Sequence, residues 1–239
     1  MKRILKIFKC IFGANINNEN NNKYIEKSDL PFKSVAEFIN HATHDYIASR
    51  ILLLQGIPGP GTIQAVTALE KIMKSYLLEL GLKVRRDGRG HNLVSLMTEL
   101  DKYDNNYLST DERKFIHHIN SAYLLRYPTE INPTFETFLP ANKVLANLDS
   151  LFCKFIESNV LDPISKGAKW YDMFKNGSMP KVQLLTKNVY FGQDRKALIE
   201  SNQWYVAYYK SNQGNVSLFR TTDIVKDDNN WKVPETLKS

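Results

Sequence analysis

The sequence lacks most of what membrane-spanning, disulfide-bonded or cofactor-binding proteins need. Its 239 residues include only two cysteines, Cys10 and Cys153, which are too few for a disulfide framework or a cysteine zinc site. No run of 18 apolar residues is present, so we expect no membrane-spanning helix. Neither a Walker phosphate loop nor a dinucleotide-binding glycine fingerprint occurs. We therefore expect a protein of the reducing cytoplasm that holds no cofactor.

An excess of positive charge is present, but it lies outside the centre of the chain. The formal net charge is +7, yet residues 31–159 contain 14 basic and 14 acidic side chains. A broad nucleic-acid-binding face would place its lysines and arginines on the central region itself. One basic cluster does occur there, and it comprises Lys83, Arg85, Arg86 and Arg89. Charge alone therefore predicts local contact with an anion at this loop, and the alternative is a loop that is simply solvated.

The first 30 residues divide into two short segments. Residues 1–13 form a basic amphipathic helix in which the apolar and lysine side chains take opposite faces. Such a helix suits weak contact with a membrane surface, and the protein would then be peripheral at the membrane. The other interpretation is that it docks on its own protein or on a dimer partner. Residues 14–30 are rich in asparagine and are predicted to be a linker.

Periodicity and end signals predict about five helices between residues 31 and 160. Apolar residues recur at helical spacing, and residues 57–62 are excluded from helix by two prolines and two glycines. On the fourth helix we expect Phe115, Ile119, Tyr123 and Leu124 to point inward. Short connections between these helices indicate an up-and-down bundle, so the protein is predicted to be mainly α. The predicted helices cover residues 35–55, 63–80, 91–103, 110–127 and 140–158.

The composition changes after Pro163. Residues 203–209 and 215–220 are rich in aromatic and β-branched side chains and are separated by a Gly-containing loop, which predicts a hairpin. A short helix is predicted at residues 194–201. Residues 161–239 are thus predicted to form a small α+β appendix, stacked on the bundle through Trp204, Tyr205 or Trp231.

Residues 64–97 carry a pattern with a family likeness. The pattern is A-x-x-x-x-E-K from Ala65, L-L-x-x-G ending at Gly81, and H-N-L-x-x-L from His91. It resembles the second and third helices of HEPN domains, helical bundles named for higher eukaryotes and prokaryotes nucleotide-binding. Residues 36–54 and 110–127 are similar to the flanking helices, so the resemblance covers about residues 34–130. It implies a helical bundle whose role concerns RNA or nucleotides.

The resemblance implies one enzymatic role, that of a metal-independent endoribonuclease in a toxin, phage-defence or stress system. Nucleases of this class resemble one another in an arginine and a histidine four to six residues apart. The histidine would take the proton of the 2′-hydroxyl, and the arginine would stabilise charge on the phosphate. Arg113 and His118 fit first, because catalytic pairs of the family usually lie on the late helix, and Arg86 and His91 fit second. The active cleft would be shared by the two protomers of a homodimer.

The resemblance implies an alternative without catalysis. The bundle would bind nucleotide or RNA through Lys83, Arg85 and Arg89, or would serve as an interaction module partnering a minimal nucleotidyltransferase. His91 would then cap the third helix, and His117 and His118 would be ordinary helix residues.

A metal site is considered and not predicted. His41, His44 and Asp45 share one face of the first helix, as metal ligands would. They are accompanied by no second ligand motif, so we expect a polar face or a dimer contact there.

Overall fold

The structure is mostly helical, with two small antiparallel sheets. This computed structural model describes residues 24–25, 35–85, 92–126, 136–165, 187–201, 204–209, 217–220 and 231–233. Residues 1–13 and the tract 15–23 lie outside the described residues. The helices are α2 (Val35–Leu54), α3 (Pro58–Glu79), α4 (Leu93–Tyr103), α5 (Thr110–Ala122), η3 (Tyr123–Arg126), α6 (Ala141–Ile156), α7 (Asp162–Ser165) and α10 (Arg195–Glu200). The strands are β1 (Tyr24–Ile25), β2 (Val84–Arg85), β3 (Thr137–Pro140), β4 (Trp204–Tyr208) and β5 (Ser217–Arg220).

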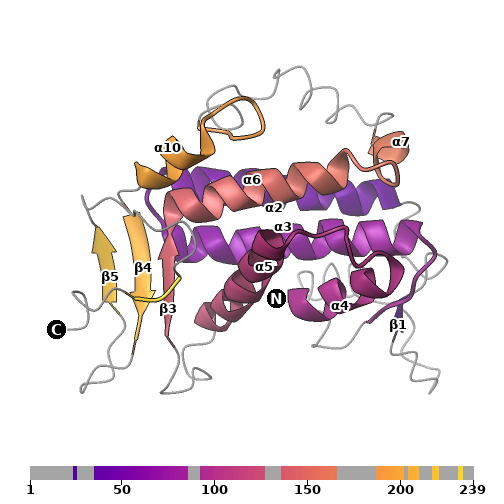
Figure 1. Cartoon of the computed structure of the whole chain (residues 1–239), viewed down its shortest axis with the longest axis horizontal. Coiled ribbons are helices and arrows are strands. Elements are labelled where there is room, and N and C mark those ends of the chain that lie inside the picture. The colour runs from indigo at the N-terminus through magenta and orange to yellow at the C-terminus, as the bar shows by residue number, and fades with distance from the viewer. Residues whose placement is uncertain are drawn as a thin grey trace, which may run out of the picture.

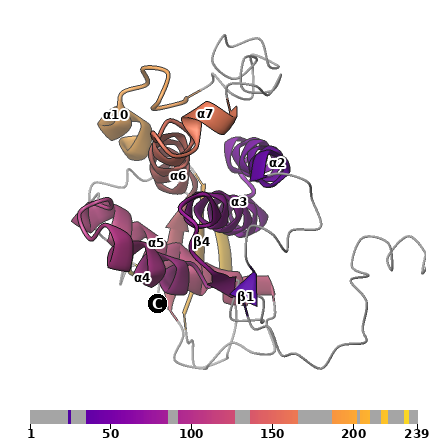
Figure 2. The same ribbon diagram turned by 90° about the vertical axis from the view of Figure 1, so that its right-hand side faces the viewer.

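Helix α3 is the centre of the bundle. Helices α2 and α6 lie on one side of it, and α4 and α5 lie on the other (Figures 1 and 2). Its side chains are buried around most of its circumference, and they belong to one apolar core shared with α2, α4, α5 and α6. A helix that is apolar nearly all round is the expected occupant of a bundle centre. The predicted mainly α bundle with a small α+β appendix is confirmed.

Helix α3 begins five residues earlier than predicted. The expectation that residues 57–62 are excluded from helix is wrong, because α3 starts at Pro58. Both prolines lie in its first turn, where backbone N–H groups have no partner within the helix. Gly61 lets this turn approach α2, since a Cβ there would lie 2.8 Å from Cγ of Leu53. Ser49 donates to the Gly61 carbonyl at 2.7 Å across the same contact.

Side-chain caps set the start of the next two long helices. Asn92 caps α4 by accepting from the N–H groups of Val94 and Ser95. Ser109 caps α5 in a reciprocal capping box with Glu112. The predicted start at His91 is therefore two residues too early, whereas the predicted start at Thr110 is confirmed.

The end of α5 tightens into the 3-10 turn η3. A 3-10 turn advances the chain by about 120° per residue rather than 100°, which changes the side chains that face the core. Leu125 is buried, whereas Leu124 is 36% exposed. The expectation that Leu124 points inward is wrong for this reason.

The larger sheet joins the middle and the last third of the chain. Its order is β3-β4-β5, and Thr137 pairs with Tyr208 at one end of the β3–β4 ladder. The predicted hairpin is present as β4 and β5, but β3 was not predicted. Strand β3 falls in the part of the chain assigned to the bundle, so the sheet draws on both predicted regions. A second, two-stranded sheet pairs β1 with β2.

A buried polar cluster lies between α2, α6 and the turn at residues 187–193. Arg50 and Asp149 form an ion pair, and neither side chain is exposed. Tyr46 donates to the same Asp149 oxygen at 2.7 Å, and the Asn188 amide donates to Tyr46 at 3.2 Å. Each group in the cluster thus has a hydrogen-bond partner, which a buried charge requires.

Gly56, at the α2–α3 connection, generates a stability prediction. Its φ is +76°, and a Cβ there would lie 2.4 Å from Cε2 of Trp204 on β4. Gly81 has a φ of +77° with no atom near that position. Gly56→Ala should lower the free energy of unfolding by about 3 kcal/mol, through backbone strain plus overlap with the indole. Gly81→Ala should cost only about 1 kcal/mol, from strain alone. Equal losses in urea unfolding would contradict the contact with Trp204.

Candidate functional site

The predicted basic loop lies only partly in the described residues. Lys83 is exposed and precedes β2, and Arg85 is the second residue of that strand. Arg86, Arg89 and His91 lie outside the described residues. The Arg86–His91 pair and phosphate binding by this loop therefore stay predictions.

Arg113 is held on the side of α5 that faces α4. Its Nη1 donates to Asp101 at 2.6 Å, its Nη2 to the Asn105 carbonyl at 2.6 Å and its Nε to the Leu108 carbonyl at 3.1 Å. The bond to Asp101 is the main cause that raises the pKa of Arg113. Two of the three donating nitrogens therefore meet carbonyls of the segment between α4 and α5, and the third meets Asp101 within α4.

His118 faces the opposite way, toward β3. Its Nε2 lies 3.1 Å from the Phe138 carbonyl and 3.2 Å from the Thr137 hydroxyl. A carbonyl oxygen only accepts, so Nε2 carries the proton and Nδ1 carries the lone pair. Burial lowers the pKa of His118 to about 4, an effect that the Phe138 carbonyl opposes and Lys143 assists. The imidazole is neutral at physiological pH.

An aromatic ring covers His118. The indole of Trp231 stacks on the imidazole, with centroids 4.2 Å apart and planes 24° apart. The Lys143 ammonium lies over the same indole at 4.1 Å. The imidazole is thus enclosed by β3, Trp231 and the helix that carries it.

The structure does not bring Arg113 and His118 together within one protomer. His118 follows Arg113 by five positions in the helix, which places the two side chains roughly 140° apart around α5. One contacts the α4–α5 connection, and the other contacts β3 and Trp231. A site that uses both would have to draw one of them from a second copy.

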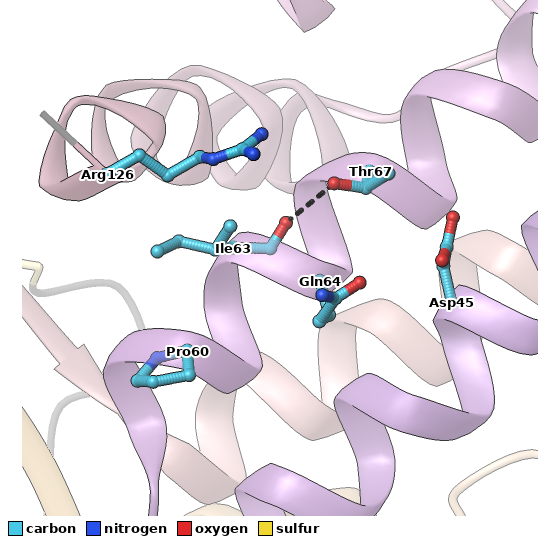
Figure 3. A pocket seen from close by; sticks show the side chains of 6 residues that line it. All are labelled: Asp45, Pro60, Ile63, Gln64, Thr67 and Arg126. Carbon is cyan, nitrogen blue, oxygen red and sulfur yellow. Dashed lines mark hydrogen bonds between the residues drawn. The ribbon is translucent and has the colours of Figure 1, made fainter. Parts of the chain in front are cut away.

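A surface cleft of about 370 Å³ lies along α3. Figure 3 shows Arg126, at the end of η3, extending its guanidinium toward α3, with Asp45 of α2 on the far side. Asp45 is paired with Lys71 at 2.5 Å, and Arg126 also stacks on Tyr123 at 5.3 Å. The cleft combines one cation with hydrogen-bonding and apolar surface. It is lined by Asp45, Pro60, Ile63, Gln64, Thr67 and Arg126.

Sequence reasoning missed this cleft. Its α3 residues recur at helical spacing and resemble any half-buried stripe of a bundle helix. Arg126 lies in the stretch 110–127 that resembles a flanking helix of the family, but nothing in the sequence brings it near Gln64. Only the packing of η3 on α3 does so.

The comparison with known families agrees with this architecture. Residues 24–151 match the family described as HEPN domain, which is more than half of the chain. The chain belongs to the HEPN domain family. The match extends from β1 into α6, so β3 and its contact with His118 lie inside the HEPN region. No curated protein and no solved structure matches the chain.

HEPN membership relates the protein to RNA or nucleotides in general terms. In the part of the chain that the structure describes, no group of three or more His, Cys, Asp or Glu side chains is placed to hold a metal ion. On α2 the rings of His41 and His44 meet edge to face at 6.4 Å. None of the described helices is long and apolar enough to cross a bilayer.

The lowered pKa of His118 predicts how the stability of this HEPN protein depends on pH. An unfolded histidine titrates near 6.5, so the unfolded chain binds this proton first as the pH falls. His118 therefore destabilises the fold progressively between pH 6.5 and pH 4, by up to about 3 kcal/mol. The full stability is present above pH 6.5.

The check is chemical denaturation of wild type and His118→Gln from pH 4 to pH 7.5. Glutamine retains an N–H for the Phe138 carbonyl but does not titrate, so its stability should fall less steeply below pH 6.5. Parallel curves for the two proteins would show that His118 is not buried in its neutral form.

Proposed function

We propose that this protein is an HEPN module that binds a nucleotide or an RNA segment and does not cleave RNA with Arg113 and His118. The family supplies the general link to RNA and nucleotides. The observation that carries the proposal is the commitment of the Arg113 guanidinium to Asp101 and two backbone carbonyls. In this role Arg113 stabilises the contact between α5 and α4, and other groups bind the phosphate.

Cleavage would need different groups from those that Arg113 and His118 offer. A phosphate would have to displace the Asp101 carboxylate from Arg113, which is a charge-assisted pair at 2.6 Å. A general base works best when its pKa lies near the working pH. The pKa of His118 is about 4, which makes its imidazole a weak base, and its Nε2 already donates to Phe138.

The cleft along α3 is the proposed place of binding. Its volume of about 370 Å³ is within the range of small-molecule sites and suits a mononucleotide. Arg126 would contact the phosphate, the Gln64 amide would meet the edge of the base, and Ile63 would lie under its face. The Asp45–Lys71 ion pair closes the end of the cleft next to α2.

The other expectations remain proposals alongside this one. Cleavage by Arg86 and His91, phosphate binding by Lys83, Arg85 and Arg89, and a role in toxin or phage-defence systems rest on the family resemblance. So do a homodimer and a nucleotidyltransferase partner. Membrane contact rests on residues 1–13 alone.

An RNA cleavage assay in EDTA tests the assignment of α5. Wild-type protein, Arg113→Gln and His118→Gln should all leave a long RNA intact, while Arg113→Gln lowers Tm because the Asp101 carboxylate loses its partner. Cleavage by wild type that both variants lose would refute the proposal. Cleavage that survives both variants and disappears in His91→Ala would assign it to the second pair.

A binding measurement tests the cleft. Arg126→Gln should weaken binding of a fluorescein-labelled hexauridylate roughly tenfold or more, because a charge-assisted hydrogen bond contributes about 1.5–3 kcal/mol. Lys102→Gln is the matched control, since it removes an exposed cation from α4 that pairs with Glu99. Fluorescence anisotropy, with AMP as competitor, provides the readout. Equal affinities for the two variants would exclude Arg126 from the site.

A further inference from the structure

The surroundings of Trp231 are unusual for a tryptophan that only fills a core. One face of the indole lies on the His118 imidazole at 4.2 Å, and the Lys143 ammonium lies over the ring at 4.1 Å. Lys143 itself is fully buried, as is Thr137 beside His118. Phe115 is farther away, with its ring centroid at 6.0 Å. The slot that receives the indole therefore combines the hydrophobic core with the His118 imidazole and the Lys143 ammonium.

The short segment that carries this indole is hydrogen-bonded to β3 and to the residue before that strand. The segment comprises Trp231–Val233, and we call it the Trp231 segment. The Phe138 N–H donates to the Trp231 carbonyl at 3.1 Å, and the Val233 N–H donates to Glu136 at 3.0 Å. Val233 is buried in the small cluster with Phe138 and Tyr205, whereas Lys232 is exposed. Trp231 is half-buried, so part of this residue is accessible to solvent.

These contacts are the ones that bind a nucleobase from a single strand. Bases stack on aromatic side chains, imidazole included, and they do so with little regard to sequence because every base has a π face. A cation over the ring adds to the stacking. An indole and a nucleobase are both flat aromatic systems, so a base can take the place of the indole between His118 and Lys143.

We propose that the slot between His118 and Lys143 is a base-stacking site for single-stranded RNA, and that the Trp231 segment occupies it as an intramolecular inhibitor. The proposal rests on the proposed RNA-binding role of the protein. It adds a second binding site, which the Trp231 segment regulates. In the closed state the indole excludes the base. When the segment leaves, the imidazole face and the ammonium become available together.

Occupation of the slot by the Trp231 segment lowers the apparent affinity for RNA, although the slot itself is unchanged. If the Trp231 segment occupies the slot nine-tenths of the time, RNA binds there about tenfold more weakly than to an open slot. Removing the indole should therefore raise the apparent affinity for RNA by the same factor of about ten. Replacing it by another aromatic ring should not.

The test measures anisotropy of labelled hexauridylate with four variants of the full chain. Trp231→Ala should bind about tenfold more tightly than wild type, and Trp231→Phe should stay near wild type. Trp204→Ala removes an indole from β4 and should produce no gain. Adding Lys143→Met to Trp231→Ala should abolish the gain, because the ammonium is lost while the side-chain length is kept.

A measurement on wild type keeps the proposal testable if Trp231→Ala unfolds. Saturating hexauridylate should shift the indole N–H resonance of Trp231 and leave that of Trp204 in place. Unchanged affinity in a folded Trp231→Ala, or an unshifted Trp231 signal, would overturn the proposal. A gain for an aromatic peptide but not for RNA would overturn it too, and would make the slot a peptide site at the β3 edge.

The outcomes separate this inference from the cleft. Loss of binding in Arg126→Gln without a gain in Trp231→Ala supports the cleft and rejects the slot. A gain in Trp231→Ala that Arg126→Gln does not alter supports the slot and rejects the cleft. Absence of RNA binding by wild type and by Trp231→Ala rejects both.

Discussion

The bundle depends on one ion pair that no water reaches. Arg50 of α2 and Asp149 of α6 are both fully buried, Tyr46 donates to Asp149, and Asn188 donates to Tyr46. Burying either charge alone would cost several kcal/mol, so the two helices can pack only in the register that brings the pair together. The Asn188 bond extends this constraint to the turn before α10. The α2–α3 wall of the cleft and the position of Lys143 on α6 both follow from that register.

Helix α5 shows how residues typical of a nuclease can stabilise the packing of a helix. Arg113 ties it to the α4–α5 connection, Glu112 ties it to Lys154 of α6, and His118 ties it to β3. The three contacts leave the helix in three directions, so α5 is fixed relative to a neighbour on each side. A motif of arginine and histidine at fixed spacing therefore identifies the helix without identifying its chemistry, because spacing does not reveal what each side chain contacts.

The sequence was sufficient for features that depend on neighbouring residues. Helical periodicity located the bundle helices, and Gly56 and Gly81 marked the ends of two of them. The Pro-Gly-Pro-Gly stretch was misjudged because proline is excluded from helix interiors but tolerated in a first turn. Strand β3 was missed because four residues carry too little pattern, and its partner lies some seventy residues later. The Arg113–Asp101 pair, the cleft and the Trp231 slot all require segments that only the tertiary fold brings together.

The pairing of β3 with β4 has a consequence for how the chain acquires its structure on the ribosome. Thr137 can pair with Tyr208 only after Tyr208 has been synthesised. Helix α6, which follows β3 directly, is synthesised long before that. During translation the helical core can assemble while β3 still offers a bare strand edge. The lid over His118 arrives later again, since Trp231 follows β5. A nascent chain therefore passes through a stage in which that imidazole is uncovered, and the finished polypeptide conceals it.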